Sequence, residues 1–145
     1  MIKEFSLFDL EKCCKLFIDV FNKPPWDDEW TNKTASAYLQ ELVDYKRFLG
    51  YTLWDNDLLI GAVFCHIKSH YRGEEVFVDE IFVKPENQRK GYGTKLMNEI
   101  ENYAKNNSFI SITLLTGKSN PAFDFYSKFG WKHLDYLAFI YKRIK

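Results

Sequence analysis

The sequence predicts an α/β fold in which about four helices cover a mixed, mostly antiparallel sheet. The apolar runs at 48–54 and 58–67 are separated only by the turn Asp55-Asn56-Asp57, which predicts an antiparallel hairpin. The next apolar run, at 76–83, is followed by a glycine-containing turn, an amphipathic helix and a further strand at 109–116. A strand, helix and strand of this length form a right-handed crossover, so these two strands should be parallel.

The elements before the hairpin follow from local patterns. A short strand at 2–5 leads to a helix in which apolar residues recur at helical spacing from Leu10 to Phe21. This helix must end before Pro24-Pro25, because proline lacks the backbone N–H that a helix interior needs. A second amphipathic helix is expected over 35–43, where apolar residues again mark one face.

The C-terminal elements are predicted in the same way. Apolar residues from Leu96 to Ala104 give the third helix one buried face. Asn120 and Pro121 suit the start of a fourth helix, and Gly130 suits its end. The final stretch, 131–143, is rich in strand-forming residues, which brings the expected sheet to six or seven strands.

Length, charge and cysteine content narrow the class of protein. A chain of 145 residues is expected to form one domain, 1–145. Lys and Arg total 20 and so do Asp and Glu, and this balance argues against a nucleic-acid partner. No apolar run approaches the roughly 20 residues of a membrane span, and no signal peptide is visible, so a cytoplasmic protein without a membrane partner is expected. The three cysteines indicate reduced thiols, and His66 and His70 lack nearby ligands, so no metal site is expected.

The stretch from Gln88 to Thr94, QRKGYGT, is the main candidate for ligand binding. The backbone amides of a glycine-rich turn at a helix N-terminus favour an anion, because unpaired N–H groups and the helix dipole point the same way. A Walker loop is excluded by the spacing, and Leu96 stands where the dinucleotide fingerprint needs its third glycine or alanine. A phosphate-binding turn is therefore predicted; the alternative is a turn whose glycines serve geometry only.

Two adjacent carboxylates, Asp79 and Glu80, interrupt the apolar strand at 76–83. Burying an unpaired carboxylate is costly, so either an ion pair with a Lys or Arg or a role in a site is expected, and we favour the site. Burial would also raise the pKa of either group toward the range of a general base. A regular strand sends neighbouring side chains to opposite faces, so only one of the two should face a given pocket.

Aromatic residues supply two further candidates. Trp26 and Trp30 bracket a run of acidic residues that includes Asp28. This segment is either a helix N-terminus with a tryptophan staple or a lid of rings and carboxylates that receives a cationic amine. Tyr126 lies on the apolar face of the fourth predicted helix, where helical spacing alone favours a core aromatic.

Three local motifs resemble the GNAT superfamily, the Gcn5-related N-acetyltransferases. Gln-x-x-Gly-x-Gly at 88–93 is similar to its acyl-CoA pyrophosphate motif, and 80–85 is similar to the strand that precedes it. The run 120–131, NPAFDFYSKFGW, resembles a third family segment, with one residue fewer between Asn120 and the alanine and with Trp131 in place of phenylalanine. The order of predicted elements extends the resemblance over nearly the whole chain, and it implies that the parallel strands splay apart, often at a bulge.

The resemblance also implies roles for individual residues. Tyr126 would protonate the departing thiolate, and Glu80 or Asp79 would take the proton of the amine, with the choice between them open. Apart from the resemblance, the rings and carboxylate of their own segment predict that Trp26, Asp28 and Trp30 bind the acceptor. The cofactor-binding residues would be Ile81, Phe82, Val83, Gln88, Arg89, Lys90, Gly91, Tyr92, Gly93, Thr94 and Asn120.

The implied function is transfer of an acetyl group from acetyl-CoA to a primary amine by direct attack in a ternary complex, without a metal. The acidic and aromatic residues favour a small cationic amine as acceptor. The alternatives are a protein lysine or N-terminal acetyltransferase and a non-catalytic acyl-CoA sensor. A monomer or a homodimer is expected.

Overall fold

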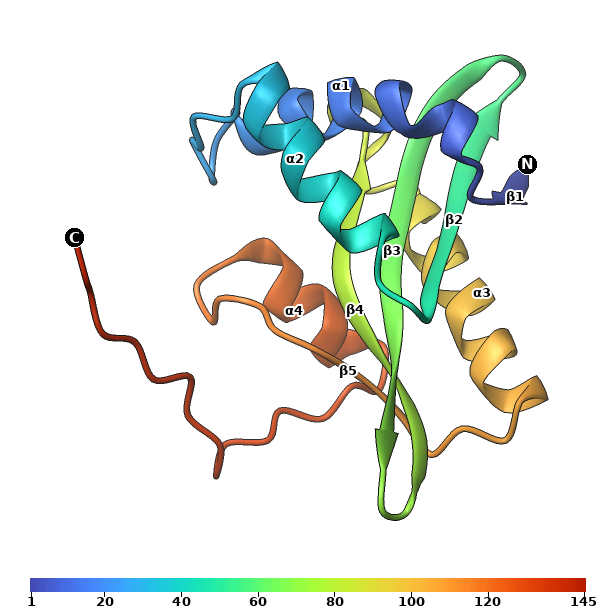
Figure 1. Cartoon of the computed structure of the whole chain (residues 1–145), viewed down its shortest axis with the longest axis vertical. Coiled ribbons are helices and arrows are strands. Elements are labelled where there is room, and N and C mark those ends of the chain that lie inside the picture. Colours follow the sequence, from blue (N-terminus) through green and yellow to red (C-terminus); the bar gives the residue numbers. More distant parts are fainter. The chain divides into compact units, whose positions relative to one another are not determined.

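The computed structural model describes all 145 residues as two compact units, 1–115 and 116–145. The first unit holds one five-stranded sheet in the order β1-β2-β3-β4-β5 and three of the four α-helices (Figure 1). The second unit holds the fourth helix. The strands are β1 (Ile2–Glu4), β2 (Phe48–Asp55), β3 (Leu58–His70), β4 (Gly73–Val83) and β5 (Ser111–Leu114), and the helices are α1 (Leu10–Phe21), α2 (Asn32–Val43), α3 (Tyr92–Asn106) and α4 (Pro121–Lys128).

The strand directions confirm the predicted mixed sheet. Strands β1 to β4 pair antiparallel with their neighbours, and β4 pairs parallel with β5 across the α3 crossover. The turn at Asp55-Asn56-Asp57 does join β2 to β3, because Asn56 accepts a left-handed conformation (φ 52°) that asparagine tolerates better than most residues. No helix of the structure is long and apolar enough to cross a membrane.

The expectation of six or seven strands was wrong, because the segment 131–143 contains no strand. Its large side chains are exposed, including Tyr136 (78%), Phe139 (81%) and Ile140 (84%). Strand-forming residues indicate only a preference, and a strand exists only where its backbone pairs with a neighbour. The composition of this segment therefore predicted strands that the chain does not form.

Helices cover both faces of the sheet in the first unit. The α1/α2 side is filled by aromatic residues, with Phe17 of α1 packed edge-on against Phe82 of β4 at 5.5 Å between ring centroids. Gly61 of β3 points to the other face, where an added Cβ would lie 3.2 Å from Leu96 of α3. Residues two apart on a strand share a face of the sheet. Because Phe82 faces the α1/α2 side, Glu80 faces that side as well.

Strand β4 is irregular at one residue. Glu80 pairs with Phe64 of β3 but Val78 pairs with Cys65, so Asp79 is an extra residue in a β-bulge. The parallel pairing with β5 ends at Val78, whereas β4 continues to Val83. The five residues after the last β5 partner thus pair only with β3.

Candidate active site

The bulge brings both carboxylates to the α1/α2 side of the sheet. Glu80 accepts a hydrogen bond from the hydroxyl of Tyr38 on α2, at 2.7 Å. Asp79 lies 2.6 Å from Nδ1 of His66, whose ring contacts Tyr45 just after α2. The prediction that only one carboxylate faces a given side assumed a regular strand, and the extra residue removes that restriction.

Glu80 has the environment of a general base. Burial raises its pKa from the ordinary 4.5 to about 7, and the negative charges of Asp79 and Asp28 add to the rise. The hydrogen bond from Tyr38 stabilises the carboxylate and partly opposes the rise. A carboxyl with a pKa near neutrality can both take up and release a proton under physiological conditions.

Tyr38 is a site residue that the sequence reasoning missed. Helical spacing places it on the apolar face of the helix expected over 35–43, yet its ring stacks on Trp30 at 5.3 Å and its hydroxyl donates to Glu80. Burial and the neighbouring Glu80 charge raise the pKa of Tyr38, so it stays a neutral hydrogen-bond donor. A core-facing tyrosine hydroxyl needs a hydrogen-bond partner, and a buried carboxylate needs a hydrogen-bond donor. The presence of both in one sequence was the signal that could have predicted the contact between Tyr38 and Glu80.

Asp79 is bound to a histidine rather than to the Lys or Arg that one expectation named. Its side chain is 9% exposed and that of His66 is 21% exposed. Burial raises the pKa of Asp79, while the hydrogen bond and charge of His66 and the charge of Lys68 act in the opposite direction. His66 had been considered only as a metal ligand, so its pairing with Asp79 was missed.

The acidic segment before α2, which contains Asp28, lies near Glu80. Trp30 donates its indole N–H to Asp28 at 3.0 Å. The Asn22 side chain forms two hydrogen bonds of 2.9 Å with the Trp30 backbone: Nδ2 donates to the carbonyl oxygen, and Oδ1 accepts from the N–H. Trp26 packs edge-on against Phe21 at 5.2 Å. The N-terminus of α2 is capped by Thr31 and Thr34, so the acidic residues are not needed as caps. The charge of Asp28 helps to raise the pKa of Glu80, and Trp30 stacks on Tyr38, which donates to Glu80.

The predicted cofactor edge is the part of β4 that continues beyond β5. Residues Ile81 to Val83 have no strand on their β5 side, so backbone groups there are available to an extended ligand. Gln88, expected to contact the cofactor, donates its side-chain amide to the Val83 carbonyl at 3.0 Å and braces the loop. An extended ligand could pair with this edge as a further strand would.

The glycine turn leads directly into α3. Gly91 is the residue before the helix and has a left-handed backbone (φ 83°), and no side chain caps the helix start. The first-turn amides of Tyr92, Gly93 and Thr94 therefore point outward together, as an anion site requires. Arg89 and Lys90 are exposed beside them and add positive charge. These residues fit a pyrophosphate.

Replacing Gly91 by Ala should weaken CoA binding about fivefold to tenfold, because the left-handed turn that aims the amides becomes strained by about 1 kcal/mol. Gly130 is a matched control: its φ is 84°, and at both positions an added Cβ meets nothing within 4 Å. Calorimetric titration with CoA measures both variants. Equal loss of CoA affinity in Gly130→Ala would contradict a specific role for Gly91.

Asn120 and Tyr126 lie in the second unit. Asn120 precedes α4 and Pro121 occupies its first turn, as predicted, although the Asn120 side chain makes no capping bond. Tyr126 is buried, with ring contacts to Phe125 at 5.2 Å and Trp131 at 5.3 Å. Their roles toward acyl-CoA stay predictions from the resemblance.

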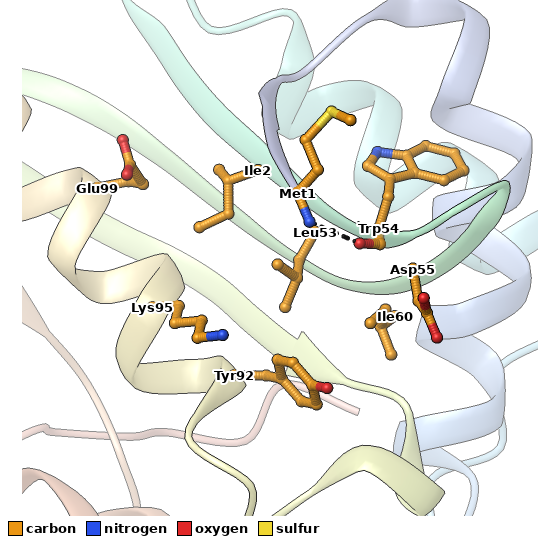
Figure 2. Close-up of a pocket in the computed structure, with 9 residues that line it drawn as sticks. All are labelled: Met1, Ile2, Leu53, Trp54, Asp55, Ile60, Tyr92, Lys95 and Glu99. Atoms are coloured by element: carbon orange, nitrogen blue, oxygen red, sulfur yellow. Dashed lines mark hydrogen bonds between the residues drawn. The ribbon is translucent and has the colours of Figure 1, made fainter.

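A hollow of about 520 Å³ lies elsewhere in the first unit, between the start of α3 and strands β1 and β2 (Figure 2). Tyr92 and Lys95 line one side of it, and Met1 and Trp54 line the other. The N-terminal ammonium of Met1 donates to the Trp54 carbonyl at 2.8 Å. Neither carboxylate of the candidate site lines this hollow.

The fold is one that solved acetyltransferase structures share. The sequence matches the acetyltransferase (GNAT) family over residues 7–131, and the chain belongs to that family.

Three known proteins illustrate the likeness. N-alpha-acetyltransferase 50 of Danio rerio is 33% identical over 92 residues, 62% of this chain and 55% of that protein. A possible acetyltransferase from Clostridium difficile 630 has a TM-score of 0.84 and 19% identity, with 100% of this chain and 98% of that chain covered. An aminoglycoside N-acetyltransferase, AAC(6')-Iy in complex with CoA, has a TM-score of 0.78 and 17% identity over 99% and 94% of the two chains. The chain spans about half the length of the curated relatives it matches.

Proposed function

We propose that the protein transfers an acetyl group from acetyl-CoA to the primary amine of a small cationic molecule, by direct attack in a ternary complex. The observation that carries this proposal is Glu80, a largely buried carboxylate with a pKa raised to about 7 and a tyrosine hydroxyl on one oxygen. It lies on the strand whose unpaired edge leads toward the glycine turn. A base and a cofactor edge on one strand suit acyl transfer to a proton-bearing nucleophile.

Glu80 acts as the base. An alkyl ammonium has a pKa near 10, so it must lose a proton before its nitrogen can attack a carbonyl. The ionised Glu80 accepts that proton, directly or through a water, and the N–H bond of the ammonium breaks as the carboxyl O–H bond forms. Tyr38 keeps the carboxylate oriented, and Asp79 is held by His66, which favours Glu80 over Asp79 as the base.

Bound acetyl-CoA would supply the acetyl group as a thioester. Backbone groups of Ile81 to Val83 would hold the pantetheine arm, and a strand N–H would polarise the acetyl carbonyl. The amides from Arg89 to Thr94 would hold the pyrophosphate, and Asn120 would contact the cofactor. Tyr126 would donate its hydroxyl proton to the departing sulfur.

Direct transfer is supported by the state of the cysteines. Cys13, Cys14 and Cys65 are all buried. Burial raises the pKa of Cys13 to about 12 and raises that of the other two thiols as well. A buried thiol with a raised pKa is a poor nucleophile, so an acyl-cysteine intermediate is not expected.

The charge around Glu80 supports a cationic acceptor. Asp28 and Asp79 both act electrostatically on Glu80, and the stacked rings of Trp30 and Tyr38 lie next to it. Carboxylates attract an ammonium group, and aromatic faces add a favourable cation–π contact. An N-terminal amine of a protein is the second candidate, because the matched relative from Danio rerio is an N-alpha-acetyltransferase.

A thiol-release assay with acetyl-CoA and a panel of amines tests the function. The panel contains polyamines, an aminoglycoside, and peptides with free lysine or N-terminal amines. The fastest release is expected with the small polycations, and Tyr126→Phe should lower kcat about 100-fold, because the ring packing stays while the acid is lost. Preference for peptides would select the second candidate, and CoA binding without release on any amine would favour a sensor.

A further inference from the structure

The pair formed by His66 and Asp79 adjoins Glu80, and neither member takes up a proton in the proposed mechanism. Asp79 is the extra residue of the bulge, and its carboxylate lies 2.6 Å from His66 Nδ1. The His66 ring is fixed between two others, with Tyr45 at 4.5 Å and Phe77 at 5.4 Å. The pair is thus held in one orientation next to the candidate base.

The net charge of the pair formed by His66 and Asp79 depends on whether His66 is protonated. When Nδ1 donates its proton to Asp79 and Nε2 is unprotonated, the pair carries one negative charge. When Nε2 also binds a proton, the imidazolium and the carboxylate cancel and the pair is neutral. Glu80 follows Asp79 in the sequence and feels its charge through a largely buried environment.

We propose that His66 is a positioning residue of this site, which holds the Asp79 carboxylate through Nδ1 and sets the electrostatic field at Glu80 through its own protonation. The inference rests on the proposed function, since it assigns His66 a part in preparing Glu80 for proton uptake. A negative pair disfavours a second negative charge on Glu80, and a neutral pair permits it. Protonation of Glu80 by the amine in turn favours proton release from His66.

The other titratable groups near the pair come from several elements packed around it. Cys65 of β3 interacts with Asp79, and burial raises the pKa of its thiol so that it stays neutral. Tyr38 and Tyr45 approach from α2 and the residues after it, and burial and the Glu80 charge raise the pKa of Tyr38 so that it stays neutral. Lys68 of β3 acts on Asp79 as a fixed positive charge. Asp28 acts on Glu80 from the segment before α2. Of these groups, His66 is the imidazole, a side chain that can be either neutral or positively charged.

The test follows the Glu80 carboxyl carbon by NMR in the full chain labelled with carbon-13 at glutamate Cδ, with the signal assigned by its loss in Glu80→Gln. His66→Asn keeps a donor near Asp79 but cannot become charged, so Glu80 should titrate about one pH unit higher than in the wild type. His66→Lys fixes a positive charge, so Glu80 should titrate about one pH unit lower. His70→Asn, an exposed change at the end of the same strand, should leave the titration unchanged.

Opposite shifts in the two His66 variants support the proposal, because a purely structural role would not reverse sign with charge. If one of the two His66 variants does not fold, the other still gives the direction of the shift in the Glu80 titration. Unchanged Glu80 titration, or shifts in the same direction, would overturn it. The shift in His66→Asn should be smaller in an Asp79→Asn background, where no carboxylate holds the imidazole beside Glu80, and a larger shift there would count against the proposal. The readout needs no substrate, so a chain that fails to acetylate amines while showing these shifts would disprove only the proposed function.

Discussion

Replacing Glu80 by Gln is expected to lower kcat/KM for the amine about 100- to 10,000-fold, the usual contribution of a general base. Glutamine has nearly the same shape, and its amide oxygen can still accept from Tyr38, but it cannot take a proton. The wild-type kcat/KM should rise with pH up to about 7, because only the ionised Glu80 accepts a proton from the amine. This rise should disappear in the variant, and steady-state thiol-release kinetics between pH 5.5 and 9 measure both effects.

Glu75→Gln is the matched control for this experiment. Glu75 lies on the same strand and is also partly buried, but its partners are Ser111 and Lys68 and it has no place in the proposed chemistry. Its pH profile should match the wild type. A Glu80→Gln variant that keeps more than about a tenth of wild-type kcat/KM would reject Glu80 as the base.

The same Glu80→Gln variant is expected to be more stable than the wild type above neutral pH. The folded-state pKa of Glu80 is raised, so the folded chain binds this proton more tightly than the unfolded chain, and the free energy of unfolding falls as pH rises from 4.5 to about 7. That difference in pKa, at 1.36 kcal/mol per pH unit, corresponds to about 3 kcal/mol. This destabilisation of the wild type by ionised Glu80 is fully present at pH 8 and absent at pH 4.

Urea unfolding of the ligand-free protein at several pH values measures this difference. The free energies of unfolding of wild type and Glu80→Gln should be close at pH 4 and should diverge above pH 5, with Glu75→Gln following the wild type throughout. A variant that is less stable than the wild type at pH 8 would mean that the carboxylate is stabilised by its surroundings. Catalytic carboxylates held in costly environments commonly show this trade of stability for activity.

Local signals explain what the sequence could predict. The hairpin turn at Asp55-Asn56-Asp57, the glycine turn at Gly91 and the proline that opens α4 each follow from conformational limits of one or two residues. The parallel pairing of β4 with β5 also follows, because the crossover rule needs only the order of the elements.

The missed features depend on contacts between distant residues. Tyr38 meets Glu80 across 42 positions, and helical spacing alone describes Tyr38 as a core aromatic. The family resemblance implied a bulge, but its position at Asp79 depends on how β4 pairs with β3, which no local pattern in the sequence reveals. The strands expected over 131–143 were predicted in error for a related reason. Composition indicates a preference for strand but does not give the neighbour with which a strand must pair.

The bulge at Asp79 has a consequence for how this site could arise. If that single residue were removed, Val78 and Glu80 would become neighbours in an unbroken ladder, and Glu80 would keep its partner Phe64 and its side of the sheet. Asp79 is therefore an addition to an otherwise ordinary strand. The addition lies where β4 parts from β5, so a single residue supplies the second carboxylate at the start of the strand's unpaired edge.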